Sequence, residues 1–245
     1  MKTVVIVQAR MTSTRLPGKV IKQILGRPMF EYQLERLLRV RCADELVVAC
    51  TTNVTDEPIV DLCRRMGVAV FRGAEEDVLS RYHETARIHQ ADLVTRVSAD
   101  CPLIDPQVID TVIEKYGDTA GKYDYVSNTL KRTYPRGMDC EMFSYRVLDE
   151  AFISATTRPE REHVTPFIYR QPERYRLANV SLGKDHSHHR WTVDTAEDFE
   201  LARRIIEALY PAKATFTLDD CLRLLELHPD WAAINTHIEQ KAYGQ

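Results

Sequence analysis

The sequence lacks the features of several specialised classes of protein. No stretch approaches the roughly 18 consecutive apolar residues of a membrane-spanning helix. The first apolar run is broken by Gln8 and Arg10, unlike the core of a signal peptide. The formal net charge is only −3, so no overall field attracts the chain to nucleic acid or to an anionic membrane. We therefore expect no membrane insertion and no nucleic-acid partner, and any binding of a polyanion must be local.

Paired cysteine motifs are missing as well. The chain contains six cysteines without a Cys-x-x-Cys pair, a distribution that favours scattered reduced thiols over a disulfide framework. We therefore expect a cytoplasmic protein. The cysteines are Cys42, Cys50, Cys63, Cys101, Cys140 and Cys221.

What the sequence does contain is a regular alternation of short apolar runs with stretches of helical periodicity. The runs 4–7, 46–49, 68–71 and 93–97 are typical of strands that are buried on both faces. Strands and helices that alternate at this spacing predict right-handed βαβ units. We therefore predict a three-layer α/β fold with a mostly parallel sheet.

Neither a low-complexity linker nor an internal repeat divides the chain, so we interpret residues 1–245 as a single domain. The alternation weakens over about 123–191, which we interpret as an insertion that provides acceptor contacts and a subunit interface. The segment of about 212–245 has helical periodicity and predicts a C-terminal helical tail. Helix starts are indicated by Pro28, Pro58, Asp105-Pro106 and the capping box from Thr195 to Asp198.

The segment 8–19, which joins the first predicted strand to the next helix, is rich in cations. Arg10, Arg15 and Lys19 can donate charge-assisted hydrogen bonds to a triphosphate, and Gly18 would let backbone N–H groups approach an anion. The patterns Gly-x-x-x-x-Gly-Lys-Ser/Thr and Gly-x-Gly-x-x-Gly are both absent. Because open α/β sheets bind ligands at this edge, we favour phosphate binding over a solvated basic turn.

Two aspartates are predicted at the same edge. Asp100 follows the strand 93–97 and, taken alone, is equally well explained as a turn residue. Asp194 is predicted to end a further strand directly before a helix, whereas Asp198 is explained by the helix start alone. Two strand-end carboxylates beside a phosphate-binding loop predict a Mg²⁺–triphosphate site, since Mg²⁺ uses few protein carboxylates and several phosphate oxygens.

Six ordered motifs span roughly residues 2–205. The first is Gln8-Ala9-Arg10-x-x-Ser13-x-Arg15-Leu16-Pro17-Gly18-Lys19. The others are Arg72-Gly73-x-x-x-Asp77-Val78-Leu79-x-Arg81-Tyr82, Asp100-Cys101-Pro102-Leu103-Ile104-Asp105, Tyr134-Pro135-x-Gly137-x-Asp139-x-Glu141, Arg161-Glu162-His163-Val164-Thr165-Pro166 and Arg190-Trp191-Thr192-x-Asp194-Thr195. Together they resemble the CMP-KDO synthetase-like cytidylyltransferases, and within them the spore coat polysaccharide SpsF type.

This resemblance implies a nucleotide-diphospho-sugar transferase-like (GT-A, Rossmann-like) sheet and a homodimeric enzyme that uses CTP and Mg²⁺. The nucleotide-binding residues that it implies are Ala9, Arg10, Arg15, Lys19, Arg72 and Ser98. The catalytic residues that it implies are Arg10, Arg15, Lys19 and Asp100, and the magnesium ligands are Asp100 and Asp194. The family commonly has glycine before the metal aspartate, where this chain has Ala99, so the choice of base stays open.

The acceptor residues that the resemblance implies all lie in the irregular half, and they are Arg136, Asp139, Glu141, Arg161, Glu162, His163 and Arg190. Arginines there can pair with a carboxylate or phosphate of the acceptor, or the same charges can form an ion-pair network within the fold, and the sequence leaves both open. The cluster of His186, His188 and His189 lacks a further ligand at suitable spacing for zinc, and we interpret it as a polar loop.

The predicted function is a Mg²⁺-dependent cytidylyltransferase for the synthesis of surface polysaccharide. It would transfer CMP from CTP to an acidic sugar, a sugar phosphate or a phosphonate, with release of pyrophosphate. The alternatives are a glycosyltransferase, a nucleotidyltransferase that uses another nucleotide, and a non-catalytic nucleotide-binding protein. The joint presence of Arg15, Lys19, Asp100 and Asp194 argues against the last of these.

Overall fold

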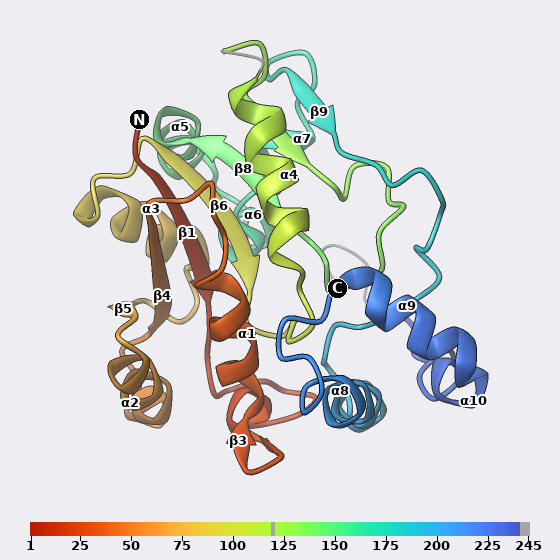
Figure 1. Cartoon of the computed structure of the whole chain (residues 1–245). Coiled ribbons are helices and arrows are strands. Elements are labelled where there is room, and N and C mark those ends of the chain that lie inside the picture. The colour runs from red at the N-terminus through yellow and green to blue at the C-terminus, as the bar shows by residue number, and fades with distance from the viewer. Residues whose placement is uncertain (119–120, 241–245) are drawn as a thin grey trace.

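In the computed structural model, which describes residues 1–118 and 121–240, the predicted apolar runs form parallel strands side by side in one sheet (Figure 1). These strands are β1 (Thr3–Gln8), β4 (Glu45–Thr51), β5 (Ala69–Gly73) and β6 (Leu93–Ser98). Val5 of β1 lies opposite Leu46 of β4 and Thr95 of β6. Val5 enters the core on one face of the sheet and Ile6 the core on the other. Burial on both faces explains why the strands are mostly apolar.

The second half of the chain adds three short strands, and the described residues form a seven-stranded sheet in the order β5-β4-β1-β6-β8-β7-β9. The added strands are β7 (Tyr125–Ser127), β8 (Glu141–Ser144) and β9 (Leu177–Asn179). β8 is antiparallel to β6 and to β7, whereas β9 is parallel to β7, so the sheet is mostly parallel, as predicted. The segment 123–191, predicted as an insertion, therefore contributes to the central sheet itself.

Helices cover both faces of the sheet and complete the predicted three layers (Figure 1). One core lies beneath α1 (Met29–Leu37), α2 (Glu57–Met66), α4 (Pro106–Gly117) and α8 (Ala196–Leu209). The other lies beneath α3 (Val78–Ile88), α5 (Tyr145–Ser154) and α7 (Pro166–Tyr169), and α6 (Arg158–His163) packs against α3. None of the helices in the described ranges is long and apolar enough to cross a membrane.

Short elements connect these layers. After β1 come the 3-10 helix η1 (Lys19–Ile21) and a hairpin of β2 (Gln23–Ile24) and β3 (Arg27–Pro28), and η2 (Val54–Asp56) precedes α2. At the C-terminal end, α9 (Leu218–Leu227) and α10 (Pro229–Ala232) pack near α8. The last residues of the predicted tail, 241–245, lie outside the described residues.

The predicted helix starts are confirmed with one shift. The Asp105 carboxylate accepts a hydrogen bond from the Gln107 N–H at 2.9 Å, and the capping box from Thr195 to Asp198 begins α8. Pro58 lies in the first turn of α2, whereas Pro28 is the residue before α1 rather than inside it. The fixed φ of proline suits either place.

Candidate active site

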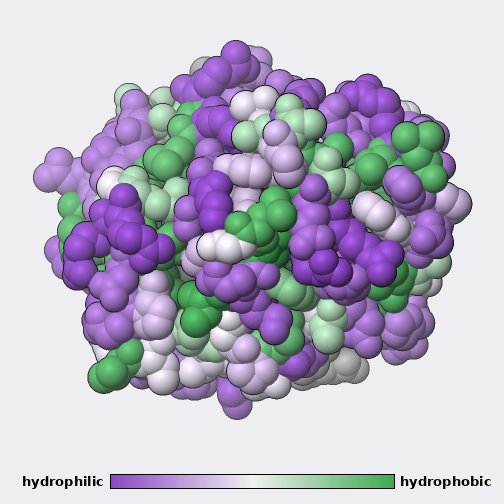
Figure 2. Space-filling model, turned by 60° about the horizontal axis from the view of Figure 1, so that its bottom comes forward, coloured by the Kyte–Doolittle hydropathy of each residue, from purple (hydrophilic) through white to green (hydrophobic). Residues whose placement is uncertain are grey.

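A cavity of about 810 Å³ opens at the carboxyl edge of the parallel strands. The loops after β1 and β6, the start of β8 and the end of α6 contribute to its lining. Figure 2 views the molecule from this side, where hydrophilic residues predominate and hydrophobic ones lie between them near the centre. The predicted site residues that line the cavity are Ala9, Arg10, Arg15, Lys19, Ser98, Asp100, Arg136, Asp139, Glu141, Glu162, His163 and Asp194.

Three predicted site residues, Arg72, Arg161 and Arg190, do not belong to the lining that the described residues form. Arg72 turns toward the loop after β4, where its Nε donates a hydrogen bond to the Thr51 carbonyl at 3.1 Å. Arg161 shares its one Nε–H between the two oxygens of Asp77, at 3.1 Å from each, and its Nη2 also donates to Oδ2 of this residue, which caps the start of α3. For Arg161, the geometry favours the ion-pair alternative over contact with an acceptor.

The loop after β1 is closed by its own backbone. Gly18 has φ +67°, a conformation that a side chain disfavours, and its N–H donates a hydrogen bond to the Met11 carbonyl at 3.0 Å. The glycine therefore makes a turn here and uses its own N–H within the loop, while the expectation that it lets backbone N–H groups approach an anion stays a prediction. The turn leads into η1 and places the Lys19 side chain at the cavity.

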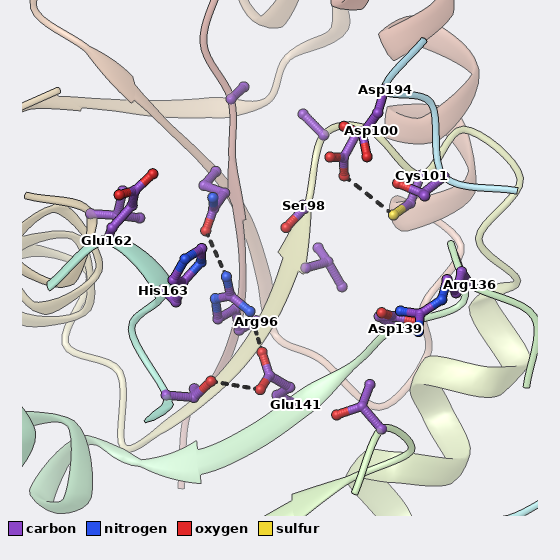
Figure 3. A pocket seen from close by; sticks show the side chains of 18 of the residues that line it. Arg96, Ser98, Asp100, Cys101, Arg136, Asp139, Glu141, Glu162, His163 and Asp194 are labelled. Atoms are coloured by element: carbon purple, nitrogen blue, oxygen red, sulfur yellow. Dashed lines mark hydrogen bonds and ion pairs between the residues drawn. The ribbon is translucent and has the colours of Figure 1, made fainter. Parts of the chain in front are cut away.

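Lys19 lies between the two predicted metal ligands. Its Nζ is 2.9 Å from Asp194 Oδ1 and 3.3 Å from Asp100 Oδ2, and it donates a hydrogen bond to the Val193 carbonyl at 2.7 Å. Arg15 Nη2 lies 2.9 Å from the other oxygen of Asp194. Figure 3 shows Asp100 and Asp194 close together on one side of the cavity. Residues separated by about 175 positions in the chain thus form one charged cluster.

The charges of this cluster stabilise one another. Burial alone would lower the pKa of Lys19, but the carboxylates of Asp100 and Asp194 outweigh it and the pKa is raised. Burial would likewise raise the pKa of Asp194, but Lys19, Arg15 and Arg190 outweigh it and the pKa is lowered. The lysine is therefore cationic and Asp194 anionic at neutral pH, as the binding of a triphosphate and a metal ion requires.

The residues present fit a magnesium ion bound together with phosphates. Two carboxylates converge on one small volume, where the Lys19 ammonium already bridges them. The described residues contain no group of three or more acidic, histidine or cysteine side chains that could hold a metal alone. Mg²⁺ usually takes one or two protein carboxylates and completes its shell with phosphate oxygens and water, so two are sufficient.

Asp194 is positioned by a buried network and not by a strand. The prediction that Asp194 ends a strand is wrong, because 191–194 forms none in the described structure, and only an isolated bridge pairs Arg136 with Arg190. Arg190 Nη2 donates to Asp194 at 3.0 Å, and its Nε donates to Asp198 at 2.9 Å. Asp198 Oδ2 also accepts the Asp194 N–H at 3.0 Å. Arg190 therefore holds the carboxylate of Asp194, one of the two predicted metal ligands, in place.

Removal of Arg190 is expected to destabilise the fold. In the variant Arg190→Met, the fully buried carboxylate of Asp198 loses its cation, and an uncompensated buried charge costs about 3–5 kcal/mol. The check is the free energy of unfolding from urea denaturation. Arg64→Met, which breaks an exposed ion pair with Asp61, is the control and should change stability by less than about 1 kcal/mol. Equal stability of the two variants would contradict the role of Arg190.

Gly137 lets its own loop approach closely the segment that leads to Asp194. It has φ +101°, and a Cβ there would lie 2.7 Å from the Thr192 nitrogen and from the Trp191 carbonyl carbon. Beside it, the Trp191 N–H donates a hydrogen bond to the Arg136 carbonyl at 2.7 Å. The loop that carries Arg136 thereby supports the segment that leads to Asp194.

Gly137→Ala is accordingly expected to lower the free energy of unfolding by about 2 kcal/mol or more, since backbone strain and overpacking add. Because the displaced segment leads to Asp194, the variant should also weaken nucleotide binding. Gly183→Ala provides a matched control, as a Cβ there meets no atom within 4 Å. Urea denaturation and a nucleotide titration measure both effects. Wild-type stability in Gly137→Ala would show that the loops are not so tightly packed.

A second group of charges lies on another wall of the cavity. The Arg132 guanidinium forms two hydrogen bonds with the carboxylate of Asp139, of which the one to Oδ2 is 2.8 Å long. Arg136 lies beside Asp139 in Figure 3, and its side chain has no ion-pair partner among the described residues. Burial lowers the pKa of Arg136, and Arg132 adds to this effect. An unpaired cation at the wall of a cavity is suited to bind an anionic group of a ligand.

The floor of the cavity holds a buried ion pair. Arg96 pairs with Glu141, whose Oε1 also accepts hydrogen bonds from the hydroxyls of Tyr125 and Thr165. Arg96 Nη2 donates to the Gln8 side chain at 3.1 Å. Glu141 is therefore bound on both oxygens by the protein. Sequence patterns did not single out Arg96 or Arg132, because their partners lie on other elements or in a loop without periodicity.

The remaining predicted residues are distributed along the cavity. Glu162 and His163 lie on the side opposite Asp100 and Asp194, with Ser98 between the two sides (Figure 3). Burial lowers the pKa of His163, which favours the neutral imidazole. The cluster of His186, His188 and His189 forms stacked and tilted ring contacts, and its backbone contacts the loop near Thr133.

The comparison with protein families is decisive for this chain. A model of the cytidylyltransferase family matches residues 4–227. The chain belongs to the cytidylyltransferase family. The membership confirms the resemblance that the ordered motifs suggested.

Individual relatives agree with this assignment. The spore coat polysaccharide biosynthesis protein SpsF of Bacillus subtilis is 31% identical over 93% of this chain and 95% of its own length. A 3-deoxy-manno-octulosonate cytidylyltransferase of Geobacter metallireducens is 29% identical over 70% of this chain and 76% of its own length. The solved structure of a cytidylyltransferase from Leptospira borgpetersenii is 30% identical, with a TM-score of 0.91 over 99% of both chains.

Proposed function

We propose that this cytidylyltransferase transfers CMP from CTP to an acidic acceptor and releases pyrophosphate. The observation that carries the proposal is the cluster of Arg15, Lys19, Asp100 and Asp194 at the cavity, because its cations and carboxylates match the parts of a metal–triphosphate complex. The relative named as a 3-deoxy-manno-octulosonate cytidylyltransferase supports CTP as the nucleotide and a sugar acid as the class of acceptor. The SpsF relative supports a role in polysaccharide biosynthesis.

In the proposed reaction, an oxygen of the acceptor attacks the α-phosphorus of CTP in line, and pyrophosphate leaves. Lys19 and Arg15 donate hydrogen bonds to the departing phosphates and balance their growing charge. Asp100 and Asp194 would hold Mg²⁺, which would neutralise phosphate charge and make the acceptor oxygen more acidic. The protein contributes mainly position and charge.

We propose that Arg136 binds the anionic group of the acceptor. Its guanidinium lines the cavity without an acidic partner among the described residues, and Arg132 and Asp139 lie beside it. A carboxylate, phosphate or phosphonate would complete this wall as a bidentate partner. Both oxygens of Asp139 accept hydrogen bonds from Arg132, and because its side chain is 39% exposed, it can also accept one from a sugar hydroxyl.

Two properties complete the proposal. We place the protein in the cytoplasm, because all six cysteines lie within the described ranges as free thiols. We also propose a homodimer, as the family resemblance implies. Sedimentation equilibrium of the purified chain tests it, with twice the chain mass expected and the single chain mass as the contradicting result.

The test of the function is a screen for pyrophosphate release. Each of the four ribonucleoside triphosphates is combined with Mg²⁺ and a panel of 3-deoxy-ulosonic acids, nonulosonic acids, sugar phosphates and phosphonates. We expect release with CTP and an acidic acceptor only. Release with UTP or GTP but not with CTP would favour a transferase for another nucleotide. Cleavage of a preformed sugar nucleotide would favour the glycosyltransferase alternative.

A further inference from the structure

Arg81 of α3 is a buried cation that has no acidic partner among the described residues. Its residue is only 2% exposed and lines the cavity. Nη1 donates a hydrogen bond to the Ala74 carbonyl at 3.1 Å, whereas the buried Nε has no hydrogen-bond partner in the described part of the chain. A buried guanidinium that is only partly satisfied costs stability, so its presence at a cavity wall calls for a ligand that completes it.

The surrounding backbone is arranged to make room for this side chain. A Cβ at Gly73, the last residue of β5, would lie 2.8 Å from Cγ of Arg81. The start of α3 is held by Asp77, which caps the helix and binds Arg161 of α6. Arg161 thus links α6 to the start of α3, the helix that carries Arg81, and Gly73 leaves space for the Arg81 side chain.

The part of the cavity near Arg81 differs from the metal–phosphate cluster. Val78, one turn earlier on α3, lines it, as do Ala9 and Val97, and these three residues are each less than 6% exposed. Figure 3 shows that α6 reaches the cavity on the side opposite Asp100 and Asp194, and α6 packs against α3. Arg10 lies close enough to Arg81 to lower its pKa, so the surroundings of Arg81 are mixed, and the apolar side chains beside its unsatisfied planar fork suit a flat ring with acceptor atoms on its edge.

We propose that Arg81 recognises the base of the nucleotide by donating two hydrogen bonds to O2 and N3 of cytosine. This inference rests on the proposed function. Cytosine presents these two acceptors side by side, whereas N3 of uracil carries a hydrogen that would face the guanidinium. An arginine fork therefore accepts cytosine and rejects uracil. Arg72, which the family motif assigned to the cytidine pocket, is directed to Thr51 and away from the lining of the described cavity.

The test compares Arg81→Met and Arg81→Lys with the unaltered protein by calorimetric titration with CTP, UTP and pyrophosphate in the presence of Mg²⁺. We expect both variants to bind CTP about tenfold or more weakly and to lose at least that much of the preference for CTP over UTP. Lysine keeps the charge but not the planar fork, so it should not restore the preference. Pyrophosphate affinity should stay within about twofold, because its contacts lie at Lys19 and Arg15.

A second ligand isolates the contact to N3. The triphosphate of 3-deazacytidine has a C–H in place of that acceptor. The unaltered protein should bind it about tenfold more weakly than CTP, whereas Arg81→Met should bind the two equally, since the group that reads N3 is gone. Arg87→Met, at an exposed arginine on the same helix, is the control and should behave like the unaltered protein.

The results that would contradict the role of Arg81 differ from the result that would contradict the proposed function. An unchanged preference for CTP in either folded variant would overturn the role of Arg81, as would equal losses of affinity for CTP and pyrophosphate. If Arg81→Met does not fold, Arg81→Lys decides the question by the same ratio. Failure of the unaltered protein to bind CTP would instead contradict the proposed function itself.

Discussion

Substitution of Lys19 by alanine is expected to reduce turnover by about a hundredfold or more, the loss typical of removing a donor that stabilises the transition state. The Lys19 ammonium lies within 3.3 Å of both Asp100 and Asp194. Arg15 contacts the other oxygen of the same Asp194 carboxylate. As pyrophosphate departs, this ammonium can balance part of the growing charge, together with Arg15. The measurement is the rate of pyrophosphate release from CTP with saturating acceptor.

The fold of Lys19→Ala should persist, because Arg15 and Arg190 still neutralise Asp194. Circular dichroism and the thermal midpoint check this point. The matched control is Lys22→Ala, three residues further along, whose exposed ammonium lies over the Phe199 ring and not in the cavity. The rate of Lys22→Ala should equal that of the unaltered protein. Normal turnover in Lys19→Ala would remove this lysine from the mechanism.

Substitution of Asp100 by asparagine is expected to abolish the Mg²⁺-dependent part of CTP binding. An amide keeps the shape of the side chain but lacks the charge that a magnesium ion requires. At about 100 times its Kd, a nucleotide should stabilise the unaltered protein by about 2.7 kcal/mol, which thermal unfolding resolves readily. This CTP-dependent rise of Tm should disappear in Asp100→Asn.

Two comparisons make the Asp100 result specific. The unaltered protein with CTP and excess EDTA should behave like Asp100→Asn with CTP and Mg²⁺. Asp219→Asn, at an exposed carboxylate in the first turn of α9, should keep the full rise of Tm. A normal, Mg²⁺-dependent rise of Tm with CTP in Asp100→Asn would show that the metal ion is held elsewhere.

The central strands were predictable from sequence because their physical requirement is simple. A parallel strand covered on both faces is apolar at nearly every position, as in Val4 to Val7, and such a run is visible without tertiary information. Helix starts such as Asp105-Pro106 were predictable for a similar reason, since the capping residue acts on its own neighbours. The face of the sheet on which each connecting helix lies follows from the right-handed crossover between parallel strands.

The strands of the second half were not predictable in this way. β7 and β9 have three residues each and β8 has four, which is too short for a clear period. β8 forms because it pairs with β6, and its Glu141 is buried against Arg96, a contact across 45 positions. An acidic residue in a buried strand contradicts its local pattern, and only the tertiary partner accounts for it.

The candidate site was predictable where its residues follow central strands, and not where their position depends on tertiary packing. Arg15, Lys19 and Asp100 were assigned to one edge because they follow predicted strands, and the structure places all three at the cavity. Arg161 and Arg81 belong to motifs of the same family, yet one binds Asp77 and the other reaches the cavity. The difference depends on how α6 packs on α3 and on the space above Gly73, neither of which a linear pattern contains.

The bond that is broken in CTP tests the account most directly. Phosphorus NMR of a reaction with CTP, Mg²⁺ and the most active acceptor of the screen distinguishes attack at the α-phosphorus of CTP from attack at its β- or γ-phosphorus. The proposed reaction yields pyrophosphate and a new CMP-linked product in equal amounts, and formation of both should be slowed about a hundredfold in Lys19→Ala. Formation of CDP with a phosphorylated acceptor or free phosphate would contradict it.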